Sequence, residues 1–159
     1  MKYCQPTTQA HPLAERYPQY LNNINTIIRE EGGTNRPFNT EVALKLDKIK
    51  ECSDDINITH MKSMDMVLGI KDGTNSLSLL VEFKLDCKNA RNLKEGELRE
   101  KIKDSKILLF GSGIPVHNRY VFIFNDELLE NESRRIISYK LTNANGEPLS
   151  IDEFRAKYF

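Results

Sequence analysis

The stretch from residue 64 to residue 85 constrains the fold of this chain more than any other. Two β-prone segments, 64–70 and 78–85, flank a connection that contains Asp72-Gly73. The Asp-Gly pair is a strong signal for a tight turn, because glycine adopts positive φ angles without steric cost. The sequence therefore predicts a β-hairpin here.

The alternation of side chains along this hairpin predicts one apolar face and one face that carries charge. Successive side chains of a strand point to opposite faces. The apolar set of the second strand is Leu79, Val81, Phe83 and Leu85. Glu82 and Lys84 fall on the other face, and in the first strand Asp65 falls opposite its apolar methionines. The hairpin is therefore expected to bring Asp65, Glu82 and Lys84 together.

Two carboxylates and an ammonium in one place suit the cleavage of a phosphodiester bond. Asp65 and Glu82 offer hard oxygen ligands of the kind that Mg²⁺ or Mn²⁺ prefers, and the backbone carbonyl of Phe83 would add a further ligand. A cation held there neutralises charge on the phosphoryl oxygens and lowers the pKa of a bound water. Lys84 would hold or help deprotonate that water, or stabilise the pentavalent state.

Composition limits the class of protein. The chain has 159 residues, of which 39% are hydrophobic and 29% charged, as expected for one globular domain rather than a disordered chain. Its formal net charge of zero argues against binding nucleic acid through bulk charge, but a local basic groove stays possible. No apolar run reaches about 18 residues and no signal core is present, so a cytoplasmic protein with no membrane partner is expected.

Apolar periodicity and turn residues predict an α/β fold with a central mixed sheet of four to five strands flanked by helices. Residues 1–18 are expected to form an irregular arm, and residues 19–159 a single domain. Ser133–Leu141 fits a strand or a helix equally well. The other expected elements are helices over 19–31 and 40–52, a strand over 56–60, the hairpin, a helix over 95–109, a strand over 118–124 and a short helix over 151–159.

This order of elements and charges resembles the PD-(D/E)XK nuclease superfamily, also called restriction endonuclease-like. In that family an Asp begins one strand, the next strand carries Glu-x-Lys, and a helix follows. Here Asp65 opens Asp-Met-Val-Leu-Gly, residues 81–84 read Val-Glu-Phe-Lys, and the helix predicted over 95–109 follows. Met64 stands where the family often has its proline, and the Gln-x-x-x-Tyr of the exonuclease branch is absent. The resemblance covers residues 38–124.

The resemblance implies a restriction endonuclease-like core and metal-dependent cleavage of DNA, as an endonuclease or an exonuclease. Asp65 and Glu82 would bind Mg²⁺ or Mn²⁺, and Lys84 would be the catalytic lysine. Family members often carry another acid on the helix before the first strand, for which Glu41 is the candidate and Glu31 and Glu51 are rivals. The basic residues that would contact DNA phosphates without sequence preference are Lys88, Arg91, Lys94, Arg99 and Lys103.

Two other interpretations remain open. A catalytically silent protein with the same fold would act as an interaction or regulatory module, with a protein partner or as a homodimer, and the acidic segment 125–132 favours it. Alternatively, Glu82 and Lys84 form an ordinary ion pair on an α/β domain of another role. Acyl-transfer chemistry is not indicated, because no Ser or Cys motif accompanies His11, His60 or His117.

Overall fold

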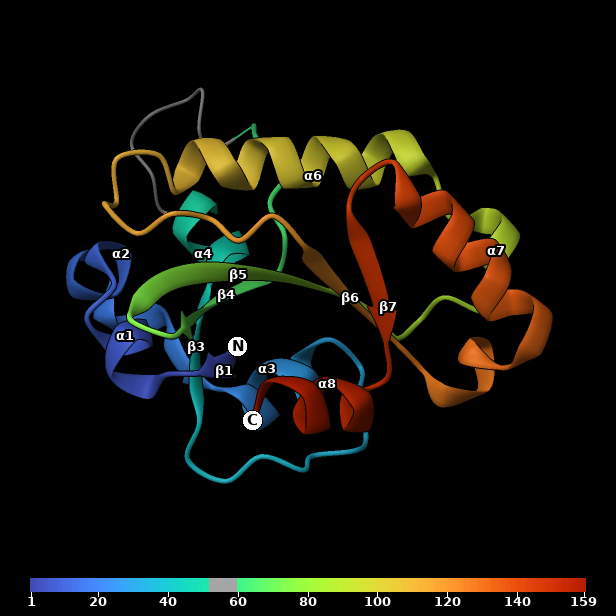
Figure 1. Ribbon diagram of the computed structural model, residues 1–159, viewed down its shortest axis with the longest axis horizontal. Coiled ribbons are helices and arrows are strands. Elements are labelled where there is room, and N and C mark those ends of the chain that lie inside the picture. The colour runs from blue at the N-terminus through green and yellow to red at the C-terminus, as the bar shows by residue number, and fades with distance from the viewer. Residues whose placement is uncertain (52–59) are drawn as a thin grey trace.

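A mixed β-sheet with helices on both faces forms the centre of the computed structural model, which describes residues 1–51 and 60–159 (Figure 1). The described part contains seven strands in the order β2-β3-β4-β5-β6-β7, and β1 pairs with β4. The pairs from β2 to β5 are antiparallel, whereas β5, β6 and β7 run parallel. The strands are β1 Lys2–Tyr3, β2 Leu21–Asn23, β3 Val42–Lys45, β4 Met66–Asp72, β5 Asn75–Lys84, β6 Tyr120–Phe124 and β7 Gly146–Leu149.

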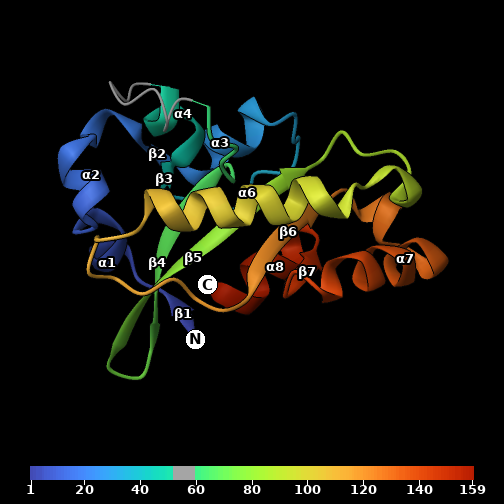
Figure 2. The same cartoon turned by 90° about the horizontal axis from the view of Figure 1, so that it is seen from above.

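Helices cover the sheet in two layers (Figures 1 and 2). The described helices are α1 Gln5–Gln9, α2 Pro12–Arg16, α3 Ile24–Glu30, α4 Leu46–Glu51, α6 Glu95–Leu108, α7 Asn131–Thr142 and α8 Ile151–Tyr158, with 3-10 turns at Pro18–Tyr20, Ala90–Asn92 and Asp126–Leu129. One buried cluster joins α4, α6 and α7 to one face of the sheet, and a second joins α3 and α8 to the other. The expected α/β class is confirmed, with more strands than the four or five expected.

The predicted hairpin forms and is the longest strand pair of the sheet. Met66 pairs with Val81 and Asp72 with Asn75, and Gly73 takes the turn with φ +60°. The expectation of a single apolar face is wrong, because Val67 and Leu80 pack under α6 while the apolar set packs under α3 and α8. Both faces of the hairpin are covered, so its charged residues lie beneath a helix rather than in open solvent.

The segment that connects the hairpin to the next strand follows the prediction closely. The helix expected over 95–109 is α6, and the apolar run expected to be a central strand is β6, all five residues of which are buried. β6 lies parallel to β5, with Val81 level with Val121. A parallel pair needs a crossover, and α6 supplies it over the face that carries Asp65 and Glu82.

The irregular arm expected over residues 1–18 does not form. Instead, β1, α1 and α2 form there, and β1 and α1 pack on β4. Gly69 of β4 makes this possible, since a Cβ at this position would lie 2.7 Å from the backbone nitrogen of Thr8. His11 in this segment is 3% exposed, and its Nδ1 accepts from the N–H of Leu13 at the start of α2.

The helix predicted over 40–52 is instead the strand β3 followed by α4. β3 pairs with both β2 and β4, so tertiary pairing overrides the helical spacing of its apolar residues. β2 likewise forms in the first part of the helix predicted over 19–31, so that only α3 is helical there. The strand predicted over 56–60 lies almost wholly outside the described residues.

The C-terminal part resolves the one ambiguous segment. Residues 133–141 lie in α7, and β7 follows at the sheet edge without having been predicted. The predicted last helix is α8, which begins with a capping box between Ser150 and Glu153. These elements complete the sheet on the side of β6 and leave Glu82 of β5 on a central strand.

Candidate functional site

Asp65 immediately precedes β4 and is fixed from both sides. Its backbone carbonyl accepts from the N–H of Leu46 at 3.0 Å, and its Oδ2 accepts from the N–H of Phe83 at 2.6 Å. The side chain is 11% exposed. The hydrogen bond from β5 therefore holds one carboxylate oxygen in place and leaves Oδ1 for another partner.

Glu82 lies in β5, next to Asp65 across the hairpin, and is 0% exposed. Its Oε1 accepts a hydrogen bond from Lys101 Nζ at 2.5 Å and forms an ion pair with Lys84 Nζ at 2.7 Å. Its Oε2 is buried and has no hydrogen-bond partner among the described residues. A buried carboxylate oxygen without a partner is costly, so this atom marks the point at which the site can accept a further group.

Lys101 of α6 is the functional residue that the sequence reasoning missed. Its ammonium lies between the two acids, 2.5 Å from Glu82 Oε1 and 3.7 Å from Asp65 Oδ1. Ser105, one turn later on the same helix, accepts from the N–H of Met64 at 2.8 Å and so fixes α6 above the start of β4. A signal was present, because Lys101 follows buried Leu98 by three residues and precedes buried Ser105 by four.

Burial and the nearby charge of Glu82 make Asp65 harder to ionise. Burial, and then the charge of Glu82, raise the pKa of Asp65 to about 7, against the opposing effect of Lys101 and the Phe83 N–H. For Lys101, burial works against the charged form, but the carboxylates of Glu82 and Asp65 outweigh it and raise the pKa of Lys101. The lysine therefore stays protonated and acts as the internal cation of the acid pair.

Glu41, the candidate for an additional acid, does not lie at this site. Glu41 immediately precedes β3, and its Oε2 accepts from the N–H of Asn39. The register of β3 and β4 puts Glu41 about five residues, or roughly 16 Å, from the level of Asp65. Glu51 is paired with Lys48 at 2.8 Å on α4. Glu31, named as a rival, is the acid that interacts electrostatically with the site.

Glu31 follows α3 and is half-buried. Burial raises the pKa of Glu31, the charges of Asp47 and Glu82 raise it further, and those of Lys45 and Lys101 lower it. Asp47 contributes a second buried oxygen, Oδ1, that has no hydrogen-bond partner in the described part of the chain. Glu31, Asp65 and Glu82 thus all act on the charge of Lys101, and Lys45 of β3 is held by Glu30.

A groove of about 510 Å³ opens over Lys84 and Lys101. Lys84 and Lys101 are 25% and 26% exposed, so their ammonium groups lie between the buried carboxylates and the groove. Its rim carries Lys62 and Lys94, opposed by Asp86 and Glu97. An anionic group entering here meets lysines before it meets the acids.

The residues expected to contact phosphates do not form one surface. Lys94 lines the groove over Lys101, although it also pairs with Glu97 at 2.9 Å. Lys88 and Arg91 lie exposed on the connection between β5 and α6. Arg99 and Lys103 face a different depression, on the side of α6 away from Lys101.

The donor set fits a hard divalent cation with few protein ligands. Among residues 1–51 and 60–159, no group of three or more His, Cys, Asp or Glu side chains is arranged to hold a metal ion. Mg²⁺ commonly takes only one or two carboxylates and completes its shell with water and substrate phosphate oxygens. Asp65 Oδ1 and the unpartnered Glu82 Oε2 suit that pattern, and the ammonium of Lys101 already bridges the same two carboxylates.

Comparisons with known proteins add little beyond this geometry. No protein-family model and no solved structure matches the chain. Two curated relatives, both from Staphylococcus aureus and one from strain MRSA252, carry the name "Uncharacterized chromosomal cassette SCCmec type IVc protein CR006". Each is 25% identical over 123 residues, which cover 77% of this chain and 16% of the relative. Among the helices that the structure describes, none has the length and apolarity to cross a bilayer.

Proposed function

We propose that this protein is a metal-dependent nuclease that hydrolyses phosphodiester bonds, with DNA as the substrate. The observation that carries the proposal is the convergence of Asp65, Glu82 and Lys84 under a groove rimmed with lysines. It supports the resemblance to the PD-(D/E)XK nucleases without depending on the sequence order alone. The chain spans only 16% of the length of its curated relatives. The proposal therefore concerns this chain and does not extend to the activity of those longer proteins.

Each residue has a distinct role in the proposed reaction. Asp65 and Glu82 would hold Mg²⁺ or Mn²⁺, which when bound neutralises charge on the phosphate and lowers the pKa of a bound water. The N–H of Phe83 keeps the Asp65 carboxylate oriented. Lys84, at the edge of the groove, would position the water or a phosphate oxygen as charge develops. Lys62 and Lys94 would attract the DNA backbone.

The test is cleavage of supercoiled plasmid and of single-stranded DNA in Mg²⁺ or Mn²⁺. Asp65→Asn, Glu82→Gln and Lys84→Met should each abolish cleavage, and EDTA should abolish it in the unchanged protein. Lys157→Met is the matched control, because this lysine pairs with Glu147 at the opposite helix layer. Cleavage that survives all three substitutions refutes the proposal.

A second function is favoured by the charge balance of the site. Lys84 and Lys101 already neutralise Glu82, and burial favours a protonated Asp65, as in a site that has become structural. In that case the protein would be a silent interaction module, acting on a partner or as a homodimer. Calorimetric titration with MnCl₂ separates the two, since the silent protein would show no binding.

A further inference from the structure

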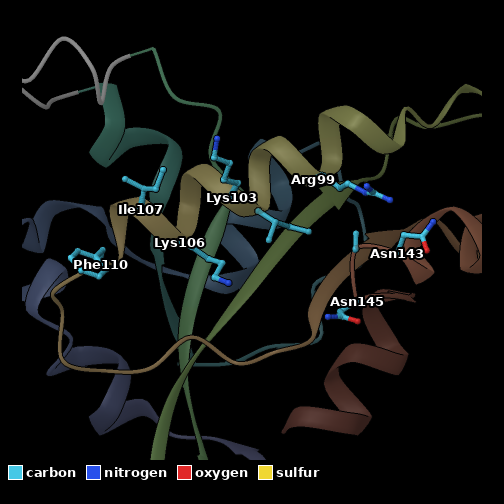
Figure 3. Close-up of a pocket in the computed structure, with 9 residues that line it drawn as sticks. Arg99, Lys103, Lys106, Ile107, Phe110, Asn143 and Asn145 are labelled. Carbon is cyan, nitrogen blue, oxygen red and sulfur yellow. The ribbon is translucent and has the colours of Figure 1, made fainter.

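The side of α6 that faces away from Lys101 borders a second, largely apolar groove of about 660 Å³. Ile102 and Ile107 line it from the helix, and the turn 143–145 before β7 forms its other side (Figure 3). Phe110, which follows α6, is 91% exposed at one end of the groove. Ile107, in the same groove, is 46% exposed, so the two side chains leave apolar surface that a ligand can bury.

The charge of this groove is positive even though the net charge of the chain is zero. Lys103 and Lys106 line it, and among the described residues neither ammonium group has a hydrogen-bond or ion-pair partner. Arg99 is held by Glu95, which also accepts from the Nδ2 of Asn143 at 3.3 Å. The two unpaired lysines therefore suit an anionic ligand, and Figure 3 shows Lys106 reaching toward the side of the turn.

The turn that faces the helix offers a fixed polar edge. Asn145 has φ +52°, a left-handed conformation that asparagine tolerates, and its carbonyl accepts from the N–H of Tyr120 at 3.1 Å. The N–H groups of Ala144 and Asn145 donate back to the end of α7. These bonds hold the Asn145 side chain at the groove, where its amide can donate to and accept from a planar polar ligand.

We propose that this groove binds single-stranded nucleic acid, with a base stacked on Phe110 and backbone phosphates on Lys103 and Lys106. An exposed aromatic ring beside lysines is the combination used for unpaired strands, because every base offers a flat face and every linkage an anion. The bases of a duplex are already stacked on one another, so the ring selects a single strand. The use of this groove to select the substrate rests on the proposed nuclease function, but binding itself does not.

The test measures binding without metal, so that it is independent of cleavage. Fluorescence anisotropy of a labelled oligo(dT) of about 16 nucleotides in EDTA gives the affinity and its salt dependence. Phe110→Ala should weaken binding roughly tenfold or more, because base stacking on an aromatic ring is lost. Lys103→Gln combined with Lys106→Gln should reduce the slope of log K against log salt by about 1.4, or about 0.7 for each phosphate contact.

Tyr139→Ala is the control for the aromatic substitution. Tyr139 is 81% exposed on α7 but does not line this groove, so its removal should leave the affinity unchanged. The proposal is overturned if the unchanged protein does not bind oligo(dT), or if Phe110→Ala binds it with the same affinity as the unchanged protein. Equal competition by a duplex would also overturn it, and equal competition by poly-glutamate would assign the groove to an acidic protein segment. Cleavage that survives in Asp65→Asn, with binding of oligo(dT) retained, would count against the nuclease site alone.

Discussion

The interaction of Lys101 with two buried carboxylates makes one prediction particularly direct. Lys101→Met removes the ammonium that lies 2.5 Å from Glu82 Oε1 and 3.7 Å from Asp65 Oδ1, while it keeps most of the side chain's length. Without a metal ion, the variant should be less stable than the unchanged protein. With Mn²⁺, it should bind the ion more tightly, because the ion no longer competes with an internal cation.

The size of both effects follows from the geometry. Removing one partner of a buried ion pair costs about 3–5 kcal/mol. Here Lys84 still pairs with Glu82 at 2.7 Å and Lys101 is 26% exposed, so a loss of about 2 kcal/mol is expected. For a chain of this size, that lowers the melting temperature by about 4–8 °C. The same free energy no longer opposes the metal, so the affinity for Mn²⁺ should rise by up to about 30-fold.

The assay combines thermal unfolding in EDTA with calorimetric titration of MnCl₂. Lys103→Met is the control, since it lies on the same helix and makes no ion pair with a described residue. If Lys101→Met has the same melting temperature as the unchanged protein and binds Mn²⁺ with the same affinity, Lys101 is not the counter-cation of the site. If the variant binds Mn²⁺ more weakly, the lysine assists the ion instead of competing with it, and the reasoning fails.

Three further outcomes are expected. The folded-state pKa of Asp65, about 7, lies above its usual 3.8, so its protonated form contributes stability that is present below pH 3.8 and lost as the pH rises to about 7. Urea unfolding in EDTA should therefore show Asp65→Asn gaining stability relative to the unchanged protein between pH 4 and pH 8, by at most about 4 kcal/mol. Gly69→Ala should cost about 1–3 kcal/mol, because its Cβ would meet the backbone of α1, whereas Gly96→Ala, in open space on α6, should stabilise by about 0.5–1 kcal/mol in the same measurement. Ser150→Ala should lower the free energy of unfolding by about 1 kcal/mol through loss of the α8 capping box with Glu153, and circular dichroism melts would reveal it.

The parts of the fold that the sequence predicted are those with strong local signals. The hairpin β4–β5 has an Asp-Gly turn and long alternating strands, α6 has apolar residues at helical spacing, and β6 is an unbroken apolar run. Each signal lies within one element and needs no knowledge of its neighbours. For that reason the α/β class could be predicted before any tertiary contact was known.

The parts that could not be predicted depend on pairing between distant segments. β2 and β3 are three and four residues long, and each exists because of a neighbouring strand rather than its own propensity. The N-terminal segment packs because Gly69 leaves room for α1 and Thr8 Oγ1 accepts from the N–H of Gly69 at 2.8 Å. The prolines of this segment lie in the first turns of its short helices, where the missing N–H costs nothing.

The residues of the candidate site fall into the same two groups, those set by one local element and those set by contacts between distant segments. Asp65, Glu82 and Lys84 belong to one hairpin, so strand alternation was enough to bring them together. Lys101 and Glu31 reach them from α6 and α3, and their position depends on how those helices pack on the sheet.

Glu41 was chosen for its place at the start of a helix that proved to be β3, and with that helix its connection to the site disappeared. Sequence spacing can identify charged groups within one element, whereas the balance of charge around a buried acid depends on which helix covers it. In this chain Lys84 and Lys101 both balance the charge of Glu82, and only Lys101 also lies next to Asp65, so the proposed divalent ion would have to displace the ammonium of Lys101.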